Sequence, residues 1–253
     1  MEEALPDKLK TMLYLNGVSV SFDGFKALNN LSIIVHPNEM LAIIGPNGAG
    51  KTTMMDIITG KTRPDDGEVY FDGRTDLTKL DEAQIANLGI GRKFQKPTVF
   101  ESQTVWDNLE MALKKPRGVL ATLGYVAAND DIQRIDDILE TIRLSARKGE
   151  LAAGLSHGQK QWLEIGMLLA QDPKLLLVDE PVAGMTDAET VETAKLLKDI
   201  AQTRSVVVVE HDMSFVRELG TRVTCLAEGT VLAEGTLDQV SANPIVIERY
   251  LGR

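Results

Sequence analysis

Residues 40–59, MLAIIGPNGAGKTTMMDIIT, decide the fold, because they combine a buried strand, a glycine-rich loop and the start of a helix. The loop matches the pattern G-x-x-x-x-G-K-[ST] without a mismatch. Glycines let successive backbone N–H groups turn toward a polyphosphate, and the helix that follows directs its positive end to the same place. The stretch therefore predicts a nucleotide phosphate site formed by Gly45, Pro46, Asn47, Gly48, Ala49, Gly50, Lys51, Thr52 and Thr53.

Two side chains of this loop have chemical roles of their own. Lys51 offers a positive charge to the β and γ phosphates, and Thr52 offers a hydroxyl to Mg²⁺. A strand before the loop and a helix after it are the context that such a site requires. A glycine-rich turn that binds no ligand is therefore the weaker interpretation.

An acidic pair ends a second apolar strand, KLLLVD at residues 174–179. A carboxylate at this end of a buried strand reaches the carboxyl edge of a parallel sheet, where the phosphates are expected. We expect Asp179 to hold Mg²⁺ through water, and Glu180 to orient and deprotonate the attacking water. A strand-ending acidic turn without function is the alternative, and the complete phosphate loop makes it the weaker one.

Composition bounds the class of protein. The 253 residues are 43% hydrophobic and 25% charged, which is ordinary for a globular chain. The longest apolar runs, at 41–44, 175–178 and 206–209, are far too short to span a membrane, and the charged N-terminus has no secretory signal pattern. Cys225 is the only cysteine, which fits a reducing cytoplasm. The net charge of −10 argues against broad binding to nucleic acid.

Hydrophobic patterning predicts an α/β core interrupted by a mostly helical insert at about residues 97–165. The core then comprises about residues 12–96 and 166–253, within one domain. Apolar strands without alternation suit a parallel sheet covered on both faces. The expected strands lie at 13–20, 31–35, 40–44, 67–71, 174–179, 205–210 and 222–226, and the expected helices of the insert lie at 104–113 and 129–144.

The residues that choose among phosphate-loop families are Leu155, Ser156, His157, Gly158 and Gln159. Followed by KQWLEIGMLLAQDPKLLLVDEP, they resemble the LSGGQ signature and its helix in ATP-binding cassette (ABC) ATPases. Gln95 resembles the Q-loop glutamine of that family, His211 the switch histidine, and Phe22 the aromatic residue beside adenine. For Phe22, a core aromatic residue at a strand end is an equal alternative. The resemblance covers about residues 13–250.

The resemblance implies a P-loop NTPase fold of the ABC type, with a RecA-like core sheet, an antiparallel β subdomain and an inserted helical lobe. It further implies a head-to-tail dimer, in which the signature reaches the γ-phosphate held by the other subunit. Gln95 would contact Mg²⁺ or water, and His211 would contact the γ-phosphate. The second ATPase subunit is a different chain or a second copy. The implied partners are two integral-membrane permease subunits and, indirectly, a periplasmic or extracellular substrate-binding protein, at the cytoplasmic face of the inner membrane.

Departures from the family pattern favour a subfamily. His157 replaces a signature glycine, and Thr186 replaces the usual aspartate of the D-loop that follows Glu180. The strings LSHGQKQWLEIGM and EPVAGMTDAE resemble ATPases of urea and branched-chain amino acid importers, and most closely the urea type. A lipopolysaccharide-export ATPase is the runner-up, although it normally keeps both signature glycines.

Other classes fit less well. Residues 78–81, TKLD, match the guanine-reading element of GTPases, but no D-x-x-G precedes them, and we interpret them as a turn and a helix start. ABC ATPases that act on DNA or the ribosome usually carry a coiled coil or two cassettes, and this sequence shows neither. A binding-only cassette is disfavoured because Asp179, Glu180 and His211 are all present.

Overall fold

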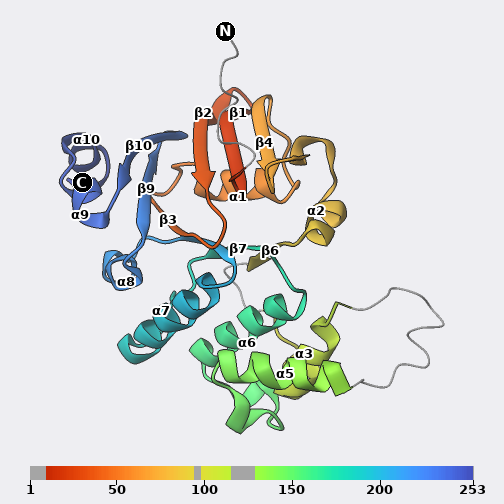
Figure 1. Ribbon diagram of the computed structural model, residues 1–253. Helices are drawn as coiled ribbons and strands as arrows, with labels where there is room; N and C mark the ends of the chain where they lie inside the picture. Colours follow the sequence, from red (N-terminus) through yellow and green to blue (C-terminus); the bar gives the residue numbers. More distant parts are fainter. Residues whose placement is uncertain (1–9, 94–97, 115–128, 253) are drawn as a thin grey trace.

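The computed structural model describes residues 10–93, 98–114 and 129–252, and it contains two β-sheets (Figure 1). The four-stranded antiparallel sheet has the order β2-β1-β4-β5. The six-stranded sheet has the order β10-β9-β3-β8-β7-β6, and its strands are parallel except for β10. The strands are β1 (Leu13–Phe22), β2 (Phe25–Val35), β3 (Met40–Ile44), β4 (Asp66–Phe71), β5 (Thr75–Asp76), β6 (Ile90–Lys93), β7 (Leu175–Asp179), β8 (Ser205–Val209), β9 (Arg222–Ala227) and β10 (Thr230–Gly235).

The central strands of the six-stranded sheet are buried on both faces. Alternate residues of β7 and β8 point to opposite sides, so Leu177 and Val207 join one hydrophobic core while Leu176 and Val208 join the other. The first core includes β1, β2 and the helix α1 (Lys51–Ile58), and the second includes the helices α6 (His157–Ala170) and α7 (Asp187–Ala201). The continuous apolar strands predicted from the sequence arise from this double coverage.

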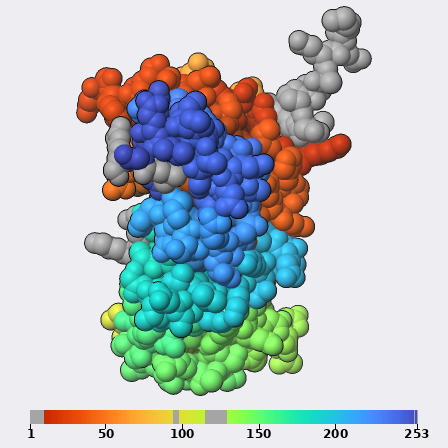
Figure 2. Space-filling model, turned by 90° about the vertical axis from the view of Figure 1, so that its left-hand side faces the viewer, coloured from red at the N-terminus to blue at the C-terminus, as the bar shows by residue number. Residues whose placement is uncertain are grey.

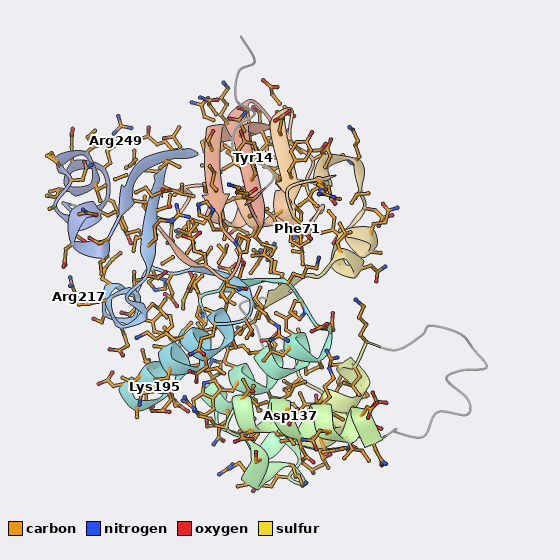
Figure 3. The ribbon with its side chains drawn as sticks, in the orientation of Figure 1. Tyr14, Phe71, Asp137, Lys195, Arg217 and Arg249 are labelled. Atoms are coloured by element: carbon orange, nitrogen blue, oxygen red, sulfur yellow. The ribbon has the colours of Figure 1, made fainter. Side chains whose placement is uncertain are left out.

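The helical lobe lies at the opposite end of the molecule from the antiparallel sheet. It is formed by α3 (Val105–Ala112), α5 (Asn129–Thr141) and α6 (Figure 1). In Figure 3, Asp137 of α5 marks this lobe, while Tyr14 and Phe71 mark the antiparallel sheet. Helix α6 continues past residue 165 to Ala170 and so connects the lobe to the sheet. The boundaries of the lobe at residues 97 and 165 stay a prediction.

Short elements complete the chain. Figure 2 shows the C-terminal strands and helices packed beside the antiparallel sheet, above the middle layer and the helical lobe. The helices are α2 (Glu82–Leu88), α8 (Met213–Leu219), α9 (Leu237–Ser241) and α10 (Pro244–Val246), with 3₁₀ turns at Leu77–Lys79, Ser145–Arg147 and Ala152–Gly154 and a π turn at Ile247–Leu251.

The fold class predicted from the sequence is confirmed, and the local differences have physical reasons. Strand β2 begins at Phe25 rather than at residue 31, because it continues through an irregular register at Asn30, whose φ is 55°. The predicted strands do not include β5, β6 or β10. Strand β5 contains two residues, and β6 contains four, two of them basic. Residues 78–81 do form a turn and a helix start, with Asp81 as the N-cap of α2.

Candidate nucleotide site

The phosphate loop is a backbone structure that requires glycine at two of its positions. Gly45 has φ 148°, and a Cβ atom there would lie 2.1 Å from the carbonyl oxygen of Leu226. Gly50 has φ 98°, and a Cβ atom there would lie 2.7 Å from the carbonyl oxygen of Ala27. The loop is therefore pressed against β9 and β2, which fixes its path before any ligand binds.

Lys51 is held across the loop. Its Nζ donates hydrogen bonds to the carbonyl oxygens of Gly45, at 2.6 Å, and Pro46, at 2.9 Å. Burial lowers the pKa of the Lys51 ammonium, and the carboxylates of Glu180 and Asp179 oppose that shift. The phosphate loop follows β3 and the acidic pair lies at the end of β7, and both are parallel strands of one sheet, so the loop and the acidic pair lie at the same carboxyl edge.

The loop runs into α1, whose N-terminus has no side-chain cap. Its N-cap residue is Gly50, and the first helical backbone bond there runs from the N–H of Met54 to the oxygen of Gly50. Thr52, in the first turn, is exposed and Thr53 is half-buried. An uncapped helix start with a positive dipole end is suited to bind an anion.

Asp179 lies at the carboxyl end of β7 and is buried. Arg92, on the neighbouring strand β6, places Nη2 3.6 Å from Oδ2 of Asp179, and its Nη1 pairs with Oδ1 of Asp56 on α1 at 2.5 Å. Burial raises the pKa of the Asp179 carboxyl, and the Arg92 guanidinium opposes the rise. Arg92 and Asp56 thus support the predicted Mg²⁺ ligand, and the sequence analysis assigned neither of them.

Glu180 has the left-handed backbone conformation, with φ 45°. This region is unfavourable for a residue with a side chain, and such strain is concentrated at functional sites. The N–H of Glu180 donates to the oxygen of Val209 at 2.9 Å, which holds the turn onto β8. One carboxylate oxygen, Oε1, lies 3.4 Å from Nδ1 of the exposed His211, so the structure brings the predicted base and switch histidine together.

Glu210 is a buried residue of the site for which the sequence analysis assigned no role. Its carboxylate accepts hydrogen bonds from the N–H groups of His211 at 2.8 Å, Asp212 at 3.2 Å and Val182 at 3.4 Å. Burial raises the pKa of Glu210, and these backbone donors oppose the rise. Glu210 therefore holds the loop of His211 against the segment that follows Glu180. Its position beside His211 at the end of a buried strand was the available signal.

The signature segment opens α6 on the helical lobe. Ser156 is the N-cap, its Oγ accepts from the N–H of Gln159 at 3.2 Å, and Gln159 Oε1 accepts from the N–H of Ser156 at 3.0 Å. This reciprocal pair is a capping box. Leu155 and Gly158 are buried, whereas Ser156 and His157 are exposed. Nε2 of His157 lies 3.1 Å from the carbonyl oxygen of Ala183, and since a carbonyl only accepts, Nε2 carries the hydrogen.

Two predicted residues have separate outcomes. Phe22 is 48% exposed at the end of β1, opposite Phe25, so the alternative of a core aromatic residue is wrong and adenine stacking stays a prediction. Gln95 lies outside the described residues, so its contact with Mg²⁺ or water also stays a prediction.

The residues present fit Mg²⁺. Thr52 and Asp179 provide hard oxygen atoms, which Mg²⁺ prefers, and this ion is usually bound by one or two protein groups plus substrate phosphates. Within the described ranges, no cluster of three or more histidine, cysteine or acidic side chains could form an all-protein metal site. Among the same residues, no helix has the length and hydrophobicity needed to cross a membrane.

Comparisons with known proteins agree with this geometry. Residues 28–183 match the ABC transporter family. The chain is 34% identical over 250 residues to the high-affinity branched-chain amino acid transport ATP-binding protein LivG of Escherichia coli strain K12, covering 95% of this chain and 98% of LivG. A nucleotide-free ATP-binding cassette from an ABC transporter superposes with a TM-score of 0.83 at 30% identity, covering 96% of this chain and 100% of that one. A dimeric bacterial ABC transporter cassette, MJ0796, gives a TM-score of 0.75 at 28% identity over 89% and 99% of the two chains.

Proposed function

This chain belongs to the ABC transporter family and is an ATP-hydrolysing subunit, and from that premise we propose that it powers an importer of branched-chain amino acids. The observation that carries the chemistry is that Asp179 ends β7 at the sheet edge where the phosphate loop follows β3, with the Glu180 carboxylate 3.4 Å from Nδ1 of His211. The observation that favours this cargo is the similarity to LivG over nearly the full length of both chains.

The catalytic proposal assigns each group a task. The loop residues 45–53 bind the phosphates of ATP, and Lys51 exchanges its carbonyl partners for phosphate oxygens. Glu180 accepts a proton from the attacking water. His211, whose Nδ1 lies 3.4 Å from Oε1 of Glu180, orients the γ-phosphate and the water. Thr52 and Asp179 would hold Mg²⁺, which neutralises charge on the transferred phosphoryl group when it is bound.

Two cassettes are needed for a complete site in this proposal. The signature segment 155–159 lies on the helical lobe, and it would face the γ-phosphate bound to the other subunit in a head-to-tail dimer. The solved dimeric cassette MJ0796 supports this arrangement by its similarity. ATP favours the closed pair and hydrolysis removes that preference, so the cycle can drive a membrane partner. The partner subunit is a different ATPase chain or a second copy.

The permease subunits would dock on the helical lobe near Phe100. This side chain is 52% exposed although its backbone is fixed, because the buried Asn108 accepts from the N–H of Phe100 at 2.8 Å and donates to its oxygen at 3.0 Å. A rigidly held, exposed aromatic residue suits a protein interface. Docking there places the chain at the cytoplasmic face of the inner membrane, with a substrate-binding protein on the opposite side.

Urea is the second candidate cargo. The strings at 155–167 and 180–189 resemble the urea type, whereas the comparisons support the branched-chain amino acid class and give urea no specific support. The cargo passes through other subunits, so the decisive test is transport.

The test measures uptake of labelled leucine and labelled urea in source cells that lack the gene or carry Glu180→Gln, with any second ATPase left intact. Loss of leucine uptake alone is the expected result. Loss of urea uptake alone would keep the mechanism and change the cargo. If neither uptake changes, the importer proposal fails, and lipopolysaccharide extraction becomes the next measurement.

A further inference from the structure

We propose that Glu189 occupies the anion site of this chain's own signature segment, and that ATP held by the partner subunit must displace its carboxylate before the dimer closes. The inference rests on the proposed function, because it assumes that Ser156 faces a phosphate across the dimer. Glu189 lies in the first turn of α7, which packs beside α6.

The carboxylate of Glu189 sits directly on the start of α6. Its Oε1 accepts a hydrogen bond from Oγ of Ser156 at 2.8 Å. A Cβ atom added to Gly158 would lie 2.6 Å from both Cδ and Oε1 of Glu189, so the glycine leaves the space that the carboxylate fills. An anion therefore already lies where the hydroxyl and the positive end of α6 would receive a phosphate.

The second carboxylate oxygen is held by the D-loop. Oε2 of Glu189 accepts from the N–H and from the Oγ1 of Thr186, each at 3.0 Å. These donors and Ser156 lower the pKa of Glu189, so the side chain is ionised at neutral pH. Thr186, which departs from the usual family aspartate, provides here a hydroxyl donor that an ionised aspartate could not provide.

His157 strengthens the same connection between the signature and the D-loop. Its Nε2 donates to the oxygen of Ala183, three residues before Thr186, and its ring lies 3.6 Å from the position of a Cβ atom on Gly184. A glycine at position 157 could not make this bond. His157 bonds to Ala183 and Thr186 bonds to Glu189, so each of the two unusual residues helps to connect the signature segment with the D-loop.

The consequence is an exchange of anions. The Ser156 hydroxyl has a single hydrogen to donate, and Oε1 of Glu189 takes it in this structure. A γ-phosphate that reached the same hydroxyl would meet a like charge at contact distance, which is unfavourable even near a protein surface. Dimer closure therefore includes the release of Glu189, and its charge raises the ATP concentration at which the pair forms.

The test removes the charge and keeps the helix cap. Glu189→Gln retains an acceptor for Ser156 and Thr186, and glutamine serves in a capping box as glutamate does. The matched control is Glu192→Gln, one turn along α7, whose Oε1 lies 2.7 Å from Nζ of Lys195, labelled in Figure 3, and whose Oε2 pairs with Arg143. Both changes remove one negative charge from the same helix.

Each change is made in Glu180→Gln protein, and dimer formation is followed by analytical ultracentrifugation as ATP is added. Glu189→Gln is expected to lower the ATP concentration for half-maximal dimer by about tenfold, as the removal of one close like charge predicts. Glu192→Gln should leave it within about twofold. An unchanged or higher ATP requirement for Glu189→Gln would overturn the inference.

A second experiment covers the case in which this chain pairs only with a different ATPase subunit. In the complete transporter, purified in detergent, Glu189→Gln in otherwise wild-type protein should lower the KM for ATP, and Glu192→Gln should not. Equal KM values for all three proteins would contradict the inference. If Glu180→Gln protein forms no ATP-dependent pair and the complete wild-type transporter hydrolyses no ATP, the proposed function fails instead, so the two failures are distinguishable.

Discussion

Two helix N-termini in this molecule are expected to face phosphate, and they are built in opposite ways. The start of α1 has a glycine N-cap and no side-chain cap, and the only charge brought to it by the loop is the Lys51 ammonium. The start of α6 has a serine N-cap, a complete capping box and the Glu189 carboxylate in contact. One terminus is prepared for an anion, whereas the other is already satisfied by its own chain. The contrast suggests that binding at α1 needs little rearrangement and binding at α6 needs an exchange.

Both helices are nevertheless tied to the same short strand. Arg92 and Lys93 are adjacent on β6, so their side chains point to opposite faces of the sheet. Arg92 pairs with Asp56 of α1, and Nζ of Lys93 lies 3.5 Å from Oε2 of Glu164 on α6. Glu164 Oε1 also accepts from Oγ1 of Thr98 at 3.0 Å. Strand β6 therefore connects to both helices, α1 and α6, through ion pairs.

The largest expected effect concerns chemistry at the α1 side. Glu180→Gln should reduce ATP hydrolysis by about 10²–10⁴-fold, the usual contribution of a general base, and leave ATP affinity unchanged, because the proposal assigns ATP binding to residues 45–53. Phosphate release and binding of a fluorescent ATP analogue measure the two quantities. Glu218→Gln, an exposed change on α8, is the control. Hydrolysis at the wild-type rate would show that another group is the base.

The next effect tests the ion pair that connects β6 with α6. Lys93→Met leaves Glu164 buried without its cation, so the free energy of unfolding should fall by about 3–5 kcal/mol. The double variant Lys93→Met/Glu164→Leu should recover most of that loss, because an apolar pair often replaces a buried ion pair without cost. Urea denaturation of the wild-type protein, Lys93→Met, Glu164→Leu and the double variant measures the cycle. Additive losses in the double variant would mean that the two side chains act independently.

A smaller effect separates the two termini directly. Lys51→Ala should weaken ATP binding to the monomer by about 10–100-fold, the range for a lost charged hydrogen bond. Ser156→Ala should leave that affinity unchanged, because the proposal assigns the α6 terminus a contact with ATP only across the dimer. Equilibrium binding at low protein concentration measures both. A comparable loss of ATP affinity in the two variants would show that the α6 terminus also contributes to binding in the monomer. That result would contradict the contrast between the two helix N-termini.

The smallest effect reports on the surroundings of α1. Cys225 is buried beside Ile44 in the sheet, and burial raises the pKa of its thiol to about 11. The folded state therefore holds the thiol proton more tightly, so the contribution of Cys225 to stability is complete below about pH 9 and is lost as the pH rises toward 11.

Labelling measures this environment, since Cys225 is the only cysteine. At pH 8 the native protein should react with an aromatic disulfide at least about 100-fold more slowly than the protein in urea, where the thiol has an ordinary pKa. Cys225→Ala should remove the signal and flatten the stability curve between pH 9 and 11. Rapid labelling of the native protein would contradict the burial.

The sequence identifies those candidate site residues that lie close together in the chain. The phosphate loop, Asp179 with Glu180, and Ser156 with Gln159 are each neighbours in the chain, so spacing alone indicates how they act together. Support residues such as Arg92 and Glu189 pair with groups more than 30 residues away, and such pairings depend on which strands are adjacent. His157 and Thr186 were recognised as departures, whereas the contact of His157 with Ala183 and that of Thr186 with Glu189 became visible only in three dimensions.

Strand β6 bears on whether unassembled chains pair through the edges of their sheets. Among the described residues it is the last strand of the six-stranded sheet, and a sheet edge can pair with the edge of another molecule and begin aggregation. The strand is short, and its two cations are fixed by acidic partners on both faces. Inward-pointing charge on a short edge strand is one of the ways in which proteins discourage such pairing. The residues that connect α1 to α6 therefore also help the unassembled chain to stay in solution.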